Sequence, residues 1–350
     1  MTAKFLLPSI LLNLAVALAG VLAQESPPHS AISGLQVSGT SLLWNGQPVM
    51  LRGVAVGDPF LAREGRPLSD YATIANVWRA NVVRISLHPS VWKATPHSQI
   101  IARLRSEAQS ALDAGMFVIL DWHVIGWPDG YFQKPDKEWD EDPRDLYDSN
   151  FALAKDFWNE VAAAFGGDGR VIFELWNEPV FQKDDYEPKT GQQWPKLKPY
   201  MAQLLEIIRA HGPNVALVTS NTWAYRLTGI RHDLLAGDNV AYAWHVYAGH
   251  DDDDEKLWAV ALDDLQTVAP VIVSEWGFQP KTKEHFRGTA ETFGKKFTRN
   301  FLDAKQLHSV AWCWHPDWTP GMLRHDWKTP TEMGAFVLNY LRAHNPPPNP

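Results

Sequence analysis

The stretch VIFELWNEP, residues Val171–Pro179, decides how this chain is organised. Four of its first five residues are apolar and predict a buried strand. The strand stops at Asn177-Glu178-Pro179, because proline has no N–H to donate to a sheet. A second apolar run, PVIVSEWG at Pro270–Gly277, repeats the design and carries Glu275 near its end. Each run therefore places a carboxylate at the end of a buried strand.

Strand-like and helix-like segments alternate along most of the chain. The strands are short continuous apolar runs, typical of a parallel sheet covered on both faces. Eight of them, nearly all followed by a helix, favour a closed α/β (β/α)8 TIM barrel over an open sheet, and no GxGxxG motif indicates a dinucleotide fold. Strands are expected at 51–56, 81–86, 116–122, 171–176, 215–219, 240–245, 270–275 and 309–314, and helices at 68–80, 99–114, 146–165, 197–210, 231–235, 256–267, 286–304 and 331–343.

A small β-hairpin is expected ahead of the first barrel strand. Apolar pieces at Leu35–Val37 and Ser41–Trp44 are followed by Asn45-Gly46, a strong signal for a hairpin turn, and by a return at Pro48–Met50. No repeat or linker follows, so we expect a single catalytic domain over residues 35–344.

The N-terminal segment predicts export from the cell. Lys4 precedes the apolar run Phe5–Val21, and small residues end at Ala23, a pattern typical of a cleaved signal peptide. An uncleaved membrane anchor is the alternative, but the run is barely long enough to span a bilayer and contains Pro8 and Asn13. The expected order is a signal peptide at 1–23, a disordered lead-in at 24–34, the domain, and a proline-rich tail at 345–350. We expect a secreted protein, extracellular or periplasmic, without stable membrane insertion.

Composition narrows the function classes. The 350 residues carry a net charge of −8, and the 32 basic residues form no cluster, so a nucleic-acid partner is not expected. The seventeen tryptophans exceed what a core needs and indicate surfaces for stacking on sugar rings. Without an HExxH or CxxC spacing we expect no metal or cofactor, and the acidic run Asp251–Glu255 is interpreted as a solvated loop. We expect a monomer.

Polar and aromatic residues gather at the carboxyl ends of the predicted strands, where TIM barrels carry their chemistry. Packing alone does not explain why seven strands contribute to one rim. These residues are Arg84 and His88, Asp121 and His123, Asn177 and Glu178, Asn221 and Trp223, His245 and Tyr247, Glu275 and Trp276, and finally Trp312, Trp314 and His315.

Two carboxylates at one rim are what hydrolysis of a glycosidic bond requires. One must be protonated near neutral pH to donate to the leaving group, while the other must be ionised. If about 5 Å separates them, the second attacks the sugar and configuration is retained. We interpret Glu178 as the acid/base, because Asn177 beside it can hold a sugar hydroxyl, and Glu275 as the nucleophile.

Supporting roles follow from residue type. Arg84 and Tyr247 can keep the nucleophile ionised by charge and hydrogen bonding, and His123 and His245 can bind hydroxyls or orient the carboxylates. Glu174 lies within its strand and is interpreted as an interior carboxylate paired with a basic group.

Other residues have plainer interpretations. Asp121 is also expected to pair inside the barrel, His88 to be a satisfied rim histidine, and Cys313 to serve packing. Tryptophans in predicted helices, Trp78 and Trp158, are expected in the core. Tryptophans in rim loops are the better sugar platforms, namely Trp127, Trp139, Trp194, Trp223 and Trp318.

The chain resembles glycoside hydrolase family 5, a family of retaining (β/α)8 enzymes that includes bacterial endoglucanases. The resemblance spans most of the chain, and its motifs stand in the right order. They are LRGV at Leu51–Val54, VVRIS at Val82–Ser86, LDWH at Leu120–His123, LWNEP at Leu175–Pro179, WHVY at Trp244–Tyr247, SEWG at Ser274–Gly277 and WCWHPDWTPGMLRHDW near the C-terminus.

The resemblance implies a set of functional residues. It implies Glu178 as acid/base and Glu275 as nucleophile, and Trp312 stacked under the sugar, with Trp314 as the alternative. The other implied members are Arg84, His123, Asn177, His245 and Tyr247. Departures from the family pattern occur at Ala55, His315 and Trp318, which bear on linkage and chain preference.

The expected activity is cleavage of internal β-1,4-glucosidic bonds in cellulose-like β-glucans, because long rim loops with several tryptophans favour an open cleft. Hydrolysis or transglycosylation of another β-glucan, a β-mannan or an exopolysaccharide is the alternative within the class. A carbohydrate-binding barrel that has lost catalysis is the alternative outside it.

Overall fold

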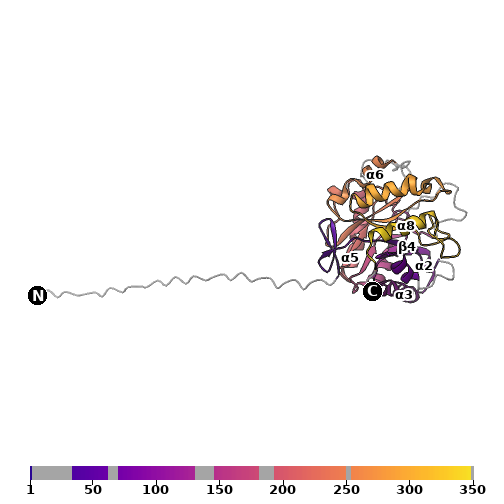
Figure 1. The fold of residues 1–350 in the computed structure, drawn as a ribbon. Coiled ribbons are helices and arrows are strands. Elements are labelled where there is room, and N and C mark those ends of the chain that lie inside the picture. Colours follow the sequence, from indigo (N-terminus) through magenta and orange to yellow (C-terminus); the bar gives the residue numbers. More distant parts are fainter. Residues whose placement is uncertain (2–33, 62–69, 131–145, 181–192, 250–253, 348–350) are drawn as a thin grey trace. The chain divides into compact units, whose positions relative to one another are not determined.

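A closed barrel of eight parallel strands forms the body of the protein (Figure 1). The computed structural model describes residues 1, 34–61, 70–130, 146–180, 193–249 and 254–347. Around the barrel the strands follow the order β10-β11-β4-β5-β6-β7-β8-β9, so each strand pairs with its neighbours in sequence and the last closes on the first. The predicted TIM barrel is confirmed. The expected signal peptide, and most of the lead-in after it, lie outside the described residues.

The elements follow the expected segments closely. The barrel strands are β4 Arg52–Gly57, β5 Val82–Leu87, β6 Phe117–Trp122, β7 Val171–Glu174, β8 Ala216–Val218, β9 Val240–Tyr247, β10 Val271–Gly277 and β11 His308–Ala311. The α-helices are α1 Asp70–Ala72, α2 Pro89–Ala94, α3 His97–Asp113, α4 Phe151–Phe165, α5 Trp194–Arg209, α6 Glu255–Leu262, α7 Lys295–Phe297 and α8 Glu332–His344.

Differences from expectation fall where the pattern is short or irregular. Helix α2 was not expected, since six residues are too few to show a helical period. The weak helix at 231–235 is instead a 3-10 turn at Ile230–His232. The single helix expected at 286–304 is broken into π-helical turns around α7. Strand β11 ends at Ala311, three residues before its predicted end.

The barrel interior changes from apolar to polar along the strands. In β6, Phe117 and Ile119 belong to the inner apolar cluster, and Asp121, the next residue on that face, is buried as well. In β7 the same step leads from Ile172 to Glu174. The amino-terminal half of the interior is therefore core, and the carboxyl-terminal half holds the ionisable groups.

The predicted N-terminal hairpin is confirmed. Strands β1 Leu35–Ser38, β2 Ser41–Trp44 and β3 Gln47–Pro48 form an antiparallel sheet. Leu35 N donates to Gly169 O at 2.8 Å, just before β7 begins, and Trp44 packs edge-on against Phe117 with 5.3 Å between ring centroids. The hairpin therefore covers the amino-terminal end of the barrel and leaves the opposite end free for chemistry.

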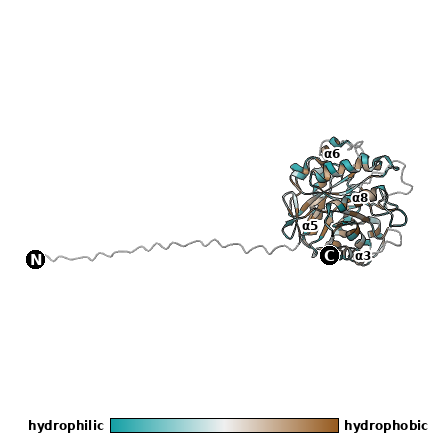
Figure 2. Ribbon diagram, viewed as in Figure 1, coloured by the Kyte–Doolittle hydropathy of each residue, from teal (hydrophilic) through white to brown (hydrophobic). Residues whose placement is uncertain are grey.

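A larger apolar layer lies between the strands and the surrounding helices. Helices α3, α5, α6 and α8 lie around the barrel (Figure 1), and hydrophilic residues are clearest on outer segments such as α6 (Figure 2). Trp78 and Trp158 belong to this layer, which confirms their expected core role. Among the described residues, no helix is both long and apolar enough to cross a membrane.

Gly53 provides a test of how tightly adjacent strands are packed. A Cβ at this position in β4 would lie 1.7 Å from the carbonyl oxygen of Val82 in β5, so the two strands would have to separate. We expect Gly53→Ala to lower the free energy of unfolding by about 3 kcal/mol or more. Urea unfolding measures it. Gly167→Ala is the control, since nothing lies within 4 Å of its added Cβ; equal effects in both variants would contradict the packing argument.

Candidate active site

Eight residues predicted for the site meet at the carboxyl-terminal end of the barrel. Each comes from a strand or from the residues just after one, and all are buried or nearly so. They are Arg84 from β5, His123 after β6, Asn177 and Glu178 after β7, His245 and Tyr247 from β9, Glu275 from β10 and Trp312 after β11. Residues up to 191 positions apart in sequence are in direct contact here.

Arg84 lies at the centre of this group with no solvent exposure. Its Nη1 donates to Glu275 at 2.7 Å, its Nε to Glu174 at 2.5 Å and its Nη2 to Asn177 at 2.7 Å, while Asp121 lies 2.9 Å from Nη2. Burial opposes the charge, but the surrounding carboxylates raise the pKa of Arg84 well above its ordinary value. The expected pairing of Glu174 and Asp121 with a basic group is confirmed.

Glu275 is held by two donors. Arg84 approaches one carboxylate oxygen, and the Tyr247 hydroxyl donates to the other at 2.5 Å. Burial, together with the negative charge of Glu275, raises the pKa of Tyr247 well above its ordinary value, so the phenol keeps its proton. Both contacts favour an ionised Glu275 as their acceptor.

Glu178 has a different electrostatic environment. Burial raises its pKa, and the negative charge of Glu275 raises it further, against the opposing effects of His245 and Arg84. Oxygen atoms of Glu178 and Glu275 lie within 4.8 Å of each other. The site therefore holds one carboxyl group that favours its proton next to one that is arranged to be ionised.

His245 lies between the carboxylates. Its Nδ1 is 3.0 Å from Glu178 Oε1, and its Nε2 is 3.0 Å from Ser274 Oγ. Burial lowers its pKa, but the charge of Glu275 and the contacts with Glu174 and Glu178 outweigh burial and raise the pKa of His245 to about 10. The ring is therefore a cation at neutral pH.

An irregularity in β10 makes this arrangement possible. Adjacent residues of a regular strand face opposite sides, yet Ser274 and Glu275 both contact interior groups. The pairing of β10 with β9 shifts register between Ile272 and Glu275. Such bulges re-aim side chains and are common near active sites.

An aromatic wall closes one side of the site. The rings of Trp312 and His123 are parallel within 4°, with centroids 5.2 Å apart, and Trp318 stacks on Trp312 at 5.8 Å and 15°. His123 Nδ1 contacts Asp121 at 2.7 Å. Burial and the charges of neighbouring histidines and Arg84 lower the pKa of His123 well below its ordinary value, so its ring is neutral.

Three tryptophans do not lie where the sequence indicated. Trp314 is buried against Trp78 at 4.4 Å, in the layer between strands and helices, because the chain leaves strand geometry after Ala311. It is therefore not brought together with Trp312. Trp127 and Trp194 were expected as rim platforms but are buried core residues.

Three further tryptophans were candidates for sugar platforms, and the structure describes two of them. Trp223 and Trp318 are partly exposed, and Trp139 lies outside the described residues. Trp223 has a left-handed backbone with φ of 51°, as do Thr222 and Ala224, and its N–H donates to Pro179 O beside Glu178. Strained backbone of this kind clusters at functional sites.

Sequence analysis missed three residues near the site. Ser274 stands inside a quoted motif, directly before Glu275, and the period of two from the inner residue Ile272 is the signal that places it inside the barrel. Asp58 accepts from both the backbone N and the ring Nδ1 of His88, at 2.8 and 2.9 Å, which confirms His88 as a satisfied rim histidine. Tyr147 packs its ring against His88 at 5.3 Å.

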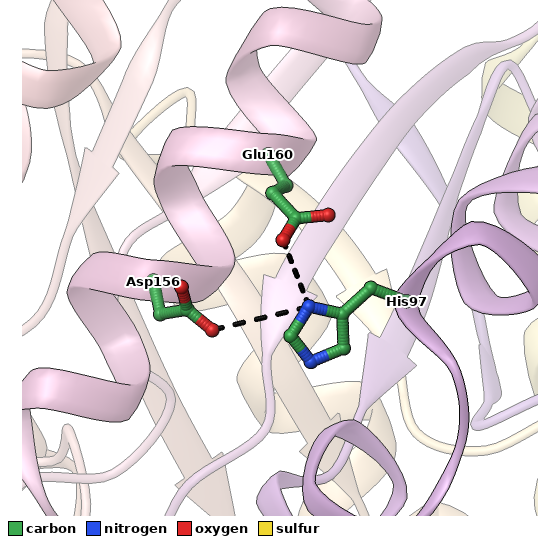
Figure 3. Close-up of side chains that lie close together, drawn as sticks. All are labelled: His97, Asp156 and Glu160. Carbon is green, nitrogen blue, oxygen red and sulfur yellow. Dashed lines mark hydrogen bonds and ion pairs between the residues drawn. The ribbon is translucent and has the colours of Figure 1, made fainter.

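Two groups in the described part of the chain have donor atoms spaced for a cation. Glu178, His245 and Glu275 form one, but their contacts are those of the site above. Figure 3 shows the other, His97 beside Asp156 and Glu160 on α4. His97 Nδ1 bonds Glu160 at 2.8 Å, so a contact between α3 and α4 accounts for the cluster.

The acidic run is only partly described. Asp254 caps the N-terminus of α6, and Glu255 accepts from Asn300 at 2.7 Å, whereas residues 251–253 lie outside the described residues.

Comparison with known proteins shows the family of the chain. The family model for cellulase, glycosyl hydrolase family 5, matches residues 43–317. The chain belongs to glycosyl hydrolase family 5. Among curated family relatives, Endoglucanase A of Evansella cellulosilytica is 27% identical over 78% of this chain and 52% of its own length. An endoglucanase of Clostridium saccharobutylicum is 26% identical over 79% of this chain and 56% of its own. This family 5 chain thus spans about half the length of these relatives.

Solved structures show the same fold. A β-glucanase of Saccharophagus degradans, solved in complex with cellotetraose, aligns with a TM-score of 0.77 and 25% identity over 89% of this chain and 93% of that one. The catalytic domain of the Thermobifida fusca endoglucanase Cel5A aligns with a TM-score of 0.68 and 21% identity, covering 88% and 97% of the two chains.

The coupling between the two carboxyl groups of this family 5 site is directly testable. Because the negative charge of Glu275 is one cause of the raised pKa of Glu178, Glu275→Gln removes that cause. We expect the pKa of Glu178 to fall in the variant. Carbon-13 NMR of glutamate carboxyl groups through a pH titration measures the shift. A pKa of Glu178 that is unchanged or higher would contradict the coupling.

Proposed function

We propose that this protein is a retaining glycoside hydrolase that cleaves internal β-1,4-glucosidic bonds of cellulose-like β-glucans. The observation that carries the proposal is the pair Glu178 and Glu275. Their oxygens lie within 4.8 Å, which fits the short carboxyl separation of retaining enzymes. Their opposite electrostatic environments also match the acid and nucleophile roles.

The first step forms a covalent intermediate. Glu275 attacks the anomeric carbon, while Glu178 gives its proton to the glycosidic oxygen as the carbon–oxygen bond breaks. The products are a glycosyl ester of Glu275, an ionised Glu178 and a free sugar hydroxyl. Burial and the charge of Glu275 favour the proton that Glu178 must supply.

The second step regenerates the enzyme. Glu178 takes a proton from a water molecule, which attacks the anomeric carbon and displaces Glu275. Two inversions at one carbon leave the β configuration unchanged. A second sugar in place of water gives transglycosylation by the same route.

Neighbouring residues supply positioning and charge. Arg84 and the Tyr247 hydroxyl hold the two oxygens of Glu275, which fixes the line of attack. Asn177 accepts from Arg84 at 2.7 Å and keeps its amide N–H groups for a sugar hydroxyl. Trp312, 7% exposed, stacks with His123 and Trp318, and this aromatic group supplies apolar surface against which a sugar ring can pack.

The choice of substrate rests on the relatives. Those reported above are named endoglucanases, and the Saccharophagus degradans β-glucanase was solved with cellotetraose. The name of that β-glucanase also supports a second candidate, hydrolysis of another β-glucan such as a mixed-linkage polymer. The presence of both carboxylates disfavours a barrel that only binds sugars.

Loss of the nucleophile tests the proposal. Glu275→Gln keeps the shape of the side chain but cannot attack, so we expect hydrolysis of soluble cellulose to fall by about 10⁴-fold or more. Cellotetraose binding and the melting temperature should stay close to wild type. Reducing-sugar release, calorimetric titration and thermal unfolding measure the three quantities.

The control variant is Glu107→Gln, which alters a fully buried carboxylate on α3 that pairs with Tyr71 and Arg103, away from the site. Its turnover should match that of wild type. A panel of soluble cellulose, mixed-linkage glucan, laminarin, mannan, xyloglucan and xylan, with chain-length analysis, tests the substrate. Unchanged turnover in Glu275→Gln would contradict the nucleophile assignment, and no activity of wild type on any β-glucan would contradict the function.

A further inference from the structure

Glu174 is a buried ionisable group that the mechanism above does not use. It ends β7, and its side chain has no solvent exposure. Its two oxygens have different partners, because Oε2 accepts from Arg84 Nε at 2.5 Å and Oε1 accepts from Ser274 Oγ at 2.8 Å. Burial raises the pKa of Glu174, but Arg84 and His245 outweigh burial and lower it, so the group is an anion.

One oxygen of Glu174 is connected to the nucleophile Glu275 by hydrogen bonds through Arg84. Arg84 is a planar fork, so a partner at Nε fixes the direction in which its other nitrogens point. The Nη1 of that fork donates to Glu275 at 2.7 Å. The orientation of Glu275 therefore depends on Glu174 through a single intervening side chain.

The other oxygen leads toward the acid/base. Ser274 has one hydroxyl proton and gives it to Glu174, so His245 Nε2, 3.0 Å from Ser274 Oγ, must be the donor to that hydroxyl. Glu174 and His245 Nε2 are 3.7 Å apart, too far for a direct hydrogen bond. The relay holds the ring so that Nε2 donates to Ser274 and Nδ1 turns toward Glu178, which lies 3.0 Å away.

We propose that Glu174 is a positioning residue that holds both carboxylates of the site, Glu275 through Arg84 and Glu178 through Ser274 and His245. This inference rests on the proposed function. Neither Glu174 nor Ser274 contacts the reacting atoms. Ser274 lies on the same face of β10 as the inner residue Ile272, and the bulge between Ile272 and Glu275 brings Glu275 to that face beside it.

Two contact chains start at Glu174: the nucleophile arm runs through Arg84 to Glu275, and the acid/base arm runs through Ser274 and His245 to Glu178. Substrates with different leaving groups distinguish the effects of the two arms. A poor leaving group needs a proton from Glu178, whereas 2,4-dinitrophenolate leaves without one. The kcat/KM of an activated aryl glycoside reports events up to bond cleavage, and so reports the nucleophile but not the acid. A residue that serves only stability would affect both substrates alike.

Ser274→Ala breaks the acid/base arm alone. We expect its kcat/KM on cellotetraose to fall by about 10- to 100-fold, while kcat/KM on 2,4-dinitrophenyl β-cellobioside changes by less than about threefold. Ser309→Ala, at a buried serine of β11, is the matched control and should match wild type on both substrates. Equal losses on both substrates in Ser274→Ala, or no loss on either, would overturn the relay.

Glu174→Gln removes the shared anchor and should lower kcat/KM on both substrates by about 100-fold or more, with Glu107→Gln as its control. A folded Glu174→Gln protein with wild-type rates would overturn the proposal. If that variant does not fold, the Ser274→Ala comparison still decides. If the wild-type protein cleaves neither substrate, the proposed function is wrong and this inference is wrong with it. If the wild-type protein is active and Ser274→Ala loses equal activity on both substrates, only the relay is contradicted.

Discussion

The buried guanidinium of Arg84 is the interaction on which the rest of the site depends. A cation without solvent exposure is stable only when hydrogen-bonded acceptors surround it, because the cost of removing it from water is several kcal/mol. Four side chains meet that need, and they come from β6, the end of β7 and β10: Asp121, Glu174, Asn177 and Glu275. Arg84 therefore fixes the relative positions of several barrel strands and of the nucleophile at once.

The charges inside the barrel then shift the pKa values of its carboxyl groups. Arg84 and His245 are cations that face four carboxyl groups. Burial raises the pKa of Asp121 and also of Glu178, while Arg84 helps to lower that of Glu174. The raised pKa of Glu178 favours the protonated form that the proposed mechanism needs in its acid.

The sequence predicts this architecture well because its signals are local. Continuous apolar runs identify the eight strands, and residues at strand ends must share one rim in a parallel barrel. Glu178 and Glu275 could therefore be placed together although 97 positions separate them in sequence. Glu174 is assigned to the interior because it lies within the strand predicted at 171–176.

The failures have physical causes. Ser274 lies on the inner face with Ile272, but a continuous apolar run does not show which of its faces is inward. The bulge that brings Glu275 to the same face leaves no trace in the hydrophobic pattern. The sequence offers Trp314 as the alternative to Trp312 at a spacing of two, but β11 ends at Ala311, so the period of two no longer applies. Trp127 and Trp194 fall in predicted rim loops yet are buried in the fold. The number and sequence position of tryptophans do not show which of them are exposed to solvent.

Trapping of the covalent intermediate tests the central claim most directly. Incubation with 2,4-dinitrophenyl 2-deoxy-2-fluoro-β-cellobioside should inactivate the enzyme, because fluorine slows both steps while the activated leaving group keeps the first one fast, so the intermediate accumulates. Peptide mass spectrometry should then find one fluorocellobiosyl group on Glu275. A label on any other residue would contradict the account, as would an active enzyme that is never labelled.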